Sequence, residues 1–183
     1  MQISDFIKFE LERVKQASDK AIGDLTPAEL RWQPSPEGNP IGLLYFHVAR
    51  SEDRFVQEFI QKKLRIWDSD KWYEKVGLPA SDAGGMGFTI EQVAAFVPPD
   101  LKKMQDFAAA VRDKTNAYLN DMTDTKFDMK ITMSMGPPPP PGAPPRPPME
   151  LSVGSVWTII LAHQRQHSGE ISYLRGLQRG TNK

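Results

Sequence analysis

The sequence predicts an all-α protein, a four-helix bundle with a proline-rich insertion before its last helix. Two observations lead to this fold class. Apolar residues recur at helical spacing in four long segments, and caps or prolines separate those segments. A chain of 183 residues can bury its own core, so we expect residues 1–183 to form a single helical bundle domain.

Composition narrows the classes of function. The 23 Lys and Arg residues balance the 23 Asp and Glu residues, so no nucleic-acid partner is expected. No run approaches the ~18 apolar residues of a membrane helix, and MQISDFIKFELERVKQ lacks the apolar region of a signal peptide. We therefore expect no membrane partner and a cytoplasmic location. The absence of cysteine excludes disulfides, cysteine zinc sites and a cysteine nucleophile.

The first long helix is expected over about residues 4–25. Its apolar positions follow a helical period, at Ile3, Ile7, Val14, Ala21 and Leu25. The stretch TPAE that follows carries a capping box, with Thr26 and Glu29 as partners and Pro27 at the first helical position. Two prolines soon end this short helical turn.

The second long helix is expected over about residues 40–64, after a start signal at Asn39-Pro40. One face of it carries the stripe Leu44, His47, Ser51 and Phe55. Residues 66–88 are expected to be irregular, because they end in SDAGGMG, a composition typical of a flexible loop.

The third long helix is expected over residues 100–122, after a short helix that Thr89 caps and that Pro98 and Pro99 end. Its stripe consists of Leu101, Met104, Ala108, Val111, Thr115, Tyr118 and Met122.

The proline-rich segment 136–148 comes next and holds nine prolines. It excludes a helix or a central strand and predicts stiff, extended polyproline II structure. We interpret it as a rigid connector between helices, with a docking ligand for an SH3-like or WW-like partner as the less favoured reading. The flanking sequences KFDMKITMSM and MELSV are expected to form a short strand pair.

The last helix is expected to begin near Ser152 or Ser155, to run to about Gln178 and to have Gly180 just past its end. Its stripe, with the intervals of a heptad-like seam, is Val156, Ile160, His163, His167, Ile171 and Leu174. We expect Gly169 to permit close approach of a neighbouring helix.

All three histidines of the chain fall on apolar stripes that should face the interior. A polar side chain in that position must be hydrogen-bonded or must bind a ligand. His163 and His167 are four residues apart on one helix, so their rings lie on the same face and can reach one metal ion at ~2.1 Å. His47 on a facing helix can supply the third nitrogen, and three imidazoles with an open position are typical of a catalytic site. The alternative is a set of hydrogen-bonded core histidines.

Several divalent transition metals accept three imidazoles. We expect zinc or nickel, with iron, cobalt, manganese or copper as alternatives. Glu170 lies three residues after His167 and is the candidate catalytic residue, as a general base. The other interpretations of Glu170 are a hydrogen-bond partner for an imidazole or a surface residue paired with Arg165 or Arg175, and the surface residue is the favoured one.

Two stretches, HVARSEDRF around His47 and LAHQRQHSGEISYLRGL around His163 and His167, resemble the DinB-like superfamily, also called DinB/YfiT-like. The segment PPDLKKMQDFAAAVRDKTNAYLNDM is similar to the third helix of that family, and the resemblance covers most of the chain. The proline-rich insertion is the departure from the family pattern.

The resemblance implies an up-down-down-up four-helix bundle, a homodimer and a divalent metal on His47, His163 and His167. It also implies an S-transferase that uses a small-molecule thiol cosubstrate. A hydrolase is the second reaction class, with a metal-bound water as its nucleophile. The alternative is a non-catalytic, dimeric, stress-associated binding protein with a structural or vestigial metal site.

Overall fold

The structure is a computed structural model that describes residues 2–82, 84–134, 136, 139 and 142–180. Four long helical segments build most of it, and short elements fill the connections. The elements in chain order are α1 (Ile3–Ile22), α2 (Pro27–Arg31), α3 (Ile41–Asp53), η1 (Arg54–Ile60), α4 (Ile66–Ser69), α5 (Trp72–Val76), α6 (Ile90–Ala95), α7 (Leu101–Asn120), α8 (Asp124–Asp128), β1 (Lys130–Met133), β2 (Met149–Ser152) and α9 (Val153–Arg179). The prediction of an all-α protein is confirmed.

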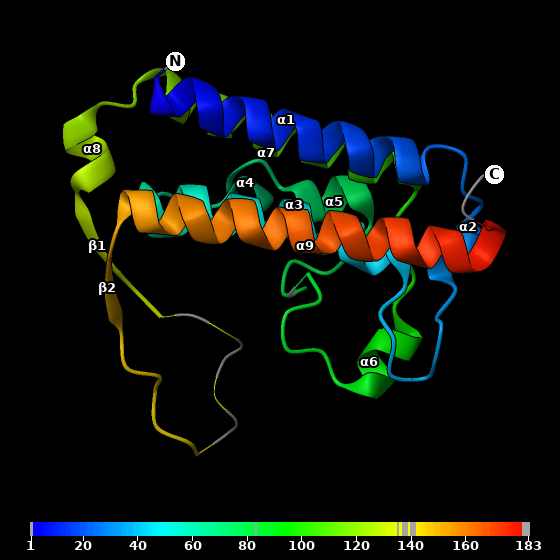
Figure 1. The fold of residues 1–183 in the computed structure, drawn as a ribbon. Helices are drawn as coiled ribbons and strands as arrows, with labels where there is room; N and C mark the ends of the chain where they lie inside the picture. The colour runs from blue at the N-terminus through cyan, green and yellow to red at the C-terminus, as the bar shows by residue number, and fades with distance from the viewer. Residues whose placement is uncertain (1, 83, 135, 137–138, 140–141, 181–183) are drawn as a thin grey trace.

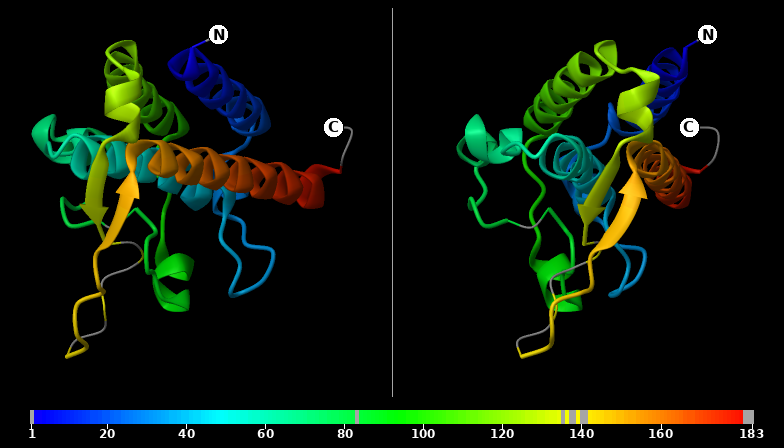
Figure 2. Two further views of the ribbon diagram at one scale, coloured as in Figure 1. Left: turned by 60° about the vertical axis from the view of Figure 1, so that its left-hand side comes forward. Right: turned by 90° about the vertical axis from the view of Figure 1, so that its left-hand side faces the viewer.

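Contacts between the long helices define their directions. Arg175 of α9 binds Asp24 just past the end of α1, so these two helices run in the same direction. Lys8 near the start of α1 binds Asn120 at the end of α7, so α7 runs in the opposite direction. The helix α3 lies beside α7 and α9, and Figures 1 and 2 show it running back toward the start of α9.

The helix ends follow the expected caps. Thr26 and Glu29 form the predicted capping box, and Thr89 forms a second one with Gln92. Asp100 caps α7 and Ser152 caps α9, which ends at Arg179 with Gly180 just past its end. Local sequence therefore sets these boundaries, as capping chemistry requires.

Two predictions in the middle of the chain need correction. The second long helix is not α-helical to residue 64, because it changes at Arg54 into the π-helix η1. The N–H of Gln61 accordingly bonds to the carbonyl of Val56, five residues earlier. Residues 66–88 are not wholly irregular either, since α4 and α5 form within them and the aromatic side chains of Trp67 and Trp72 pack toward Phe107 of α7.

The predicted strand pair is present. β1 and β2 are antiparallel, with Lys130 opposite Ser152 and Met133 opposite Met149. Figure 2 shows the pair leaving the bundle where α9 begins. Four prolines of the segment 136–148, at 137, 138, 140 and 141, lie outside the described residues, so its polyproline II structure stays a prediction.

The apolar stripes supply the core. Val156, Ile160, Ile171 and Leu174 of α9 are all buried, as their spacing predicts. None of the helices in the described part of the chain has the length and apolar character to cross a membrane.

Candidate metal centre

The three histidines meet where α3 crosses α9. The Nε2 atom of His163 lies 3.2 Å from Nε2 of His47 and 3.1 Å from Nε2 of His167. One potential ligand atom from each ring lies within 4.8 Å of the other two. The sequence prediction that these residues share one site therefore agrees with their placement.

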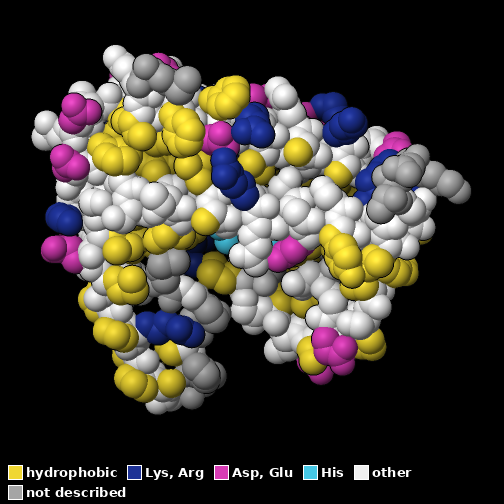
Figure 3. Space-filling model, in the orientation of Figure 1, with side chains coloured by type: hydrophobic (Ala, Val, Ile, Leu, Met, Phe, Trp, Pro, Cys, Tyr) yellow, Lys and Arg dark blue, Asp and Glu magenta, His cyan; other side chains and the backbone are white. Residues whose placement is uncertain are grey.

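Helix geometry explains the convergence. His163 and His167 are one helical turn apart on α9, so their rings lie on one face, where they meet edge to face. α3 packs against that face and brings His47 opposite both rings. The three side chains are partly buried, and Figure 3 shows histidine colour within a hollow of the surface.

Hydrogen bonds at the outer ring nitrogens fix two of the three tautomers. His47 donates from Nδ1 to the backbone carbonyl of Gly84 at 2.7 Å, and His167 donates from Nδ1 to Oε2 of Glu170 at 2.6 Å. A carbonyl or carboxylate oxygen can only accept, so Nδ1 carries the hydrogen and Nε2 presents its lone pair inward.

The surroundings of His47 and His163 favour their neutral imidazoles. Burial lowers the pKa of His47. Burial also lowers the pKa of His163 to about 4, helped by repulsion from His167 and His47. Neutral imidazole is the form that binds a metal, so burial leaves His47 and His163 in their metal-binding form at neutral pH.

The donor set fits a divalent transition metal. Two nitrogens that each bind one tetrahedral ion at ~2.1 Å lie about 3.4 Å apart. The two Nε2 separations to His163 are only slightly shorter than that spacing. The spacing of the three nitrogens is therefore compatible with one bound cation.

In the structure Glu170 is a hydrogen-bond partner of an imidazole, which is one of the three roles expected for it from the sequence. Its carboxylate binds His167 and also accepts a hydrogen bond from Gln166. Partial burial opposes its ionisation, but these hydrogen bonds outweigh that effect and lower its pKa. The two arginines proposed as surface partners bind elsewhere, Arg165 to Glu10 and Arg175 to Asp24.

Gly169 was expected to permit the close approach of a neighbouring helix, and this prediction is wrong. A Cβ atom at this position would meet open space, so no neighbouring helix approaches it closely. The close approach occurs instead at Gly154, where a Cβ would lie 2.4 Å from the ring of Phe127.

Sequence reasoning missed a buried polar network beside the site. Arg112 of α7 forms a bidentate ion pair with Glu52 of α3 at 2.9 and 2.8 Å, and Gln164 of α9 binds both. Glu52 adjoins Ser51 and Gln164 adjoins His163, so the network joins the helices that carry the histidines. The sequence offered one indication of this network: a polar residue, Glu52 or Gln164, directly follows a residue of each stripe that carries a histidine.

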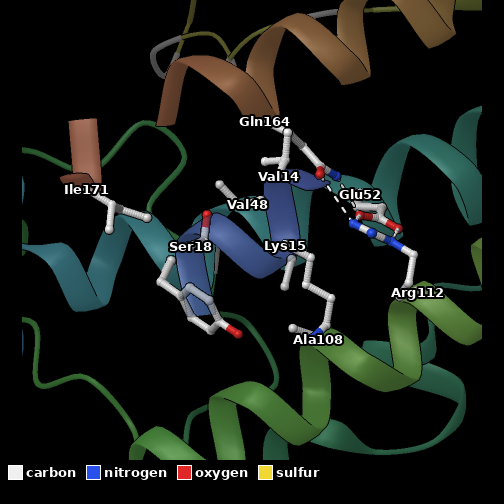
Figure 4. Close-up of a pocket in the computed structure, with 11 residues that line it drawn as sticks. Val14, Lys15, Ser18, Val48, Glu52, Ala108, Arg112, Gln164 and Ile171 are labelled. Carbon is white, nitrogen blue, oxygen red and sulfur yellow. Dashed lines mark hydrogen bonds and ion pairs between the residues drawn. The ribbon is translucent and has the colours of Figure 1, made fainter. Parts of the chain in front are cut away.

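The network borders a small pocket between α1, α3, α7 and α9. Figure 4 shows Glu52, Arg112 and Gln164 at one side of it and Ser18 and Lys15 at another. The pocket measures about 30 Å³, which is room for one or two water molecules. It is too small for an organic substrate, so the histidine site is the better candidate for chemistry.

Comparisons with known proteins agree with this geometry. A family model described as the DinB superfamily matches residues 10–171. A solved structure described as a conserved protein of locus from Enterococcus faecalis is similar, with a TM-score of 0.78, 22% identity and 97% of each chain covered. That similarity concerns the fold. A comparison with curated proteins finds no match.

Proposed function

The chain belongs to the DinB superfamily, and on that premise we propose that it is a divalent-metal-dependent enzyme whose metal is held by His47, His163 and His167. Family membership and the three-histidine cluster fit a metal-binding protein. The observation that carries the proposal is the convergence of three Nε2 atoms, two of them with the lone pair directed inward by an outer hydrogen bond.

The proposed metal is zinc or nickel, with iron, cobalt, manganese or copper as alternatives, because three neutral nitrogen ligands suit all of them. A bound divalent metal supplies Lewis acidity, which lowers the pKa of a water or thiol at an open position. The chain itself contributes the imidazoles of His47 and His163, which burial keeps neutral, and a carboxylate that orients the ring of His167.

We propose two reaction classes for this site, an S-transferase with a small-molecule thiol cosubstrate, which the family resemblance implies, or a hydrolase. Since the chain has no cysteine, a thiol would have to arrive as a cosubstrate. Glu170 is the candidate base in the hydrolase version, and its bond to His167 supports an additional role in orienting that ligand.

The assembly and the proline-rich segment are part of the same proposal. We propose a homodimer, as in the family that the chain resembles. The segment 136–148 joins two paired strands, which supports its role as a connector within the chain over a role as a partner ligand.

A metal-binding measurement tests the proposal. Purified protein, stripped with a chelator and titrated with Zn²⁺, Ni²⁺ or Co²⁺, should bind one ion per chain, and metal should raise the melting temperature. His163→Ala should abolish tight binding because it removes one of three ligands. Ser172→Ala is the matched control, since the exposed Ser172 lies on the same helix and, among the described residues, its hydroxyl binds only the backbone carbonyl of Ser168.

Two results would count against the proposal. Wild-type protein that binds none of these metals would leave the non-catalytic binding protein as the better reading. A His163→Ala variant with wild-type metal content would reject the ligand set.

A further inference from the structure

The buried side chain of Arg50 binds the loop that contains Asp82 and Gly84, and the carbonyl of Gly84 binds His47. We propose that Arg50 is a positioning residue, which sets the orientation of His47 and thereby the metal affinity without touching the metal. This inference rests on the proposed function, because it assigns the support of one ligand of that metal site.

Two side chains from a single turn of α3 donate hydrogen bonds to this loop. His47 and Arg50 are three residues apart, so they project from the same side of the helix. His47 donates to the carbonyl of Gly84 at 2.7 Å, and Arg50 donates from Nη2 to the carbonyl of Asp82 at 2.6 Å. The loop is tightened further because the N–H of Gly84 donates to the Asp82 carboxylate at 2.7 Å.

The loop lies directly on the arginine stem. A Cβ atom on Gly84 would lie 2.8 Å from both Cβ and Cγ of Arg50, closer than real side chains pack. Gly84 also has φ +62°, a left-handed conformation that favours glycine. The position of the Gly84 carbonyl is therefore set by contact with Arg50 as well as by the hydrogen bond to Asp82.

The Arg50 side chain is itself held in place by Trp67. Its guanidinium lies 3.6 Å from the centre of the Trp67 ring, a close cation–π contact. The indole N–H of Trp67 donates to the carbonyl of Ala80 at 3.0 Å, which fixes the loop on its other side. The carboxylate of Asp53, the last residue of α3, accepts hydrogen bonds from the backbone N–H groups of Ile66 and Trp67, both at 3.0 Å. These bonds anchor α4.

The cost of burying this arginine points to a role beyond packing. Arg50 is 5% exposed, and within the described residues its Nε and Nη1 atoms are buried without a hydrogen-bond partner. Burial lowers its pKa to about 10, so it still carries its charge at neutral pH. An apolar side chain of similar size would avoid this penalty, but it could not hold the Asp82 carbonyl.

The ring of His47 gives a direct readout in metal-free protein. At pH 8, long-range proton–nitrogen NMR spectra distinguish protonated from unprotonated ring nitrogens. We expect wild-type His47 to show one tautomer, with the hydrogen on Nδ1. Arg50→Met keeps an apolar stem but removes the donor, and it should give His47 a mixture of both tautomers.

Titration with Co²⁺ alone measures the effect on binding. We expect Arg50→Met to weaken Co²⁺ binding by roughly 10- to 100-fold, the range found when a group that supports a metal ligand is removed. Arg50→Lys keeps the charge and one donor, so it should recover part of this loss. Arg65→Met is the matched control, because Arg65 pairs with Asp68 near the same tryptophan and makes no described bond to the loop.

The outcomes separate this inference from the proposed function. If wild-type protein binds no Co²⁺, the proposed function fails, while the NMR comparison still decides whether Arg50 orients His47. If Arg50→Met keeps a single His47 tautomer and binds Co²⁺ within about twofold of wild type, the inference is overturned. Should Arg50→Met not fold, Gly84→Ala displaces the loop with Arg50 in place, and wild-type behaviour of that variant also overturns it.

Discussion

At the scale of residues, the proposed metal centre depends on atoms that face away from it. The Gly84 carbonyl and the Glu170 carboxylate bind the outer nitrogens of His47 and His167, so both inner nitrogens are ready to bind a cation. A carboxylate partner also makes an imidazole a stronger electron donor. The two outer partners differ in charge, which gives a test of how much each contributes.

Glu170→Gln should weaken metal binding by about tenfold. The amide oxygen can still accept the hydrogen of His167 Nδ1, but the negative charge that strengthens this ligand is lost. Isothermal titration with Zn²⁺ at pH 7.5 measures the effect. Affinity equal to that of wild type would show that the carboxylate does not support the metal site.

Acid should destabilise the metal-free protein through His163. Its pKa in the folded state is about 4, below the ordinary 6.5, so protonation favours the unfolded chain. The stabilisation by neutral His163 is complete above pH 6.5 and declines as the pH falls toward 4. By pH 5 this single group should reduce the free energy of unfolding by about 2 kcal/mol.

Urea unfolding at pH 7.5 and pH 5 checks this expectation. His163→Gln cannot be protonated, so its stability should change less between the two pH values. An equal change in both proteins would contradict a depressed pKa at His163.

At the scale of elements, capping residues set the helix ends and close contacts set how the elements meet. α8 packs on the first turn of α9, where Gly154 faces the ring of Phe127. Gly169 in the middle of the same helix faces open space. These two glycines look alike in the sequence but differ in surroundings, so the same substitution should have opposite effects.

Gly154→Ala should destabilise the protein by roughly 1–3 kcal/mol, because its methyl group would overlap the Phe127 ring. Gly169→Ala should stabilise it by roughly 0.5–1 kcal/mol, because alanine favours the helix and its methyl group meets nothing. Chemical denaturation of both variants measures the difference. The structural account would be wrong if the two changes had the same sign.

At the scale of the whole molecule, the Glu52–Arg112–Gln164 network joins three of the four long helices. Glu52 is 3% exposed, and although burial opposes its ionisation, Arg112 keeps its pKa low. Both charges are therefore present inside the bundle, next to the helices that carry the histidines. Such a pair makes the arrangement of α3, α7 and α9 sensitive to the loss of either partner.

Arg112→Met should lower the free energy of unfolding by roughly 3–5 kcal/mol, because it leaves the Glu52 carboxylate buried without its cation. The double variant Glu52→Gln with Arg112→Met should be closer to wild type, since no unpaired charge remains. A double-mutant cycle from urea unfolding measures the coupling. Additive losses in the two single variants would show that the residues do not act as a pair.

Much of the fold could be predicted from the sequence, because helix ends and buried helix faces depend on residues close together in the chain. The capping box of Thr26 and Glu29 and the buried face of α9 both follow from residues close together in the chain. The π-helix at Arg54 and the short helices α4 and α5 could not be predicted in this way. Asp53 anchors α4 from a distant point in the chain, and no local spacing reports that contact.

The sequence by itself determined the long helices, their caps and the set of three histidines, since helical periodicity and residue type are local properties. Only the tertiary structure decided how those rings are oriented. The groups that orient them, the Gly84 carbonyl and the Arg50 guanidinium that holds its loop, act through contacts between segments more than 30 residues apart. Backbone carbonyls occur at every residue, so no sequence pattern marks the one that binds His47.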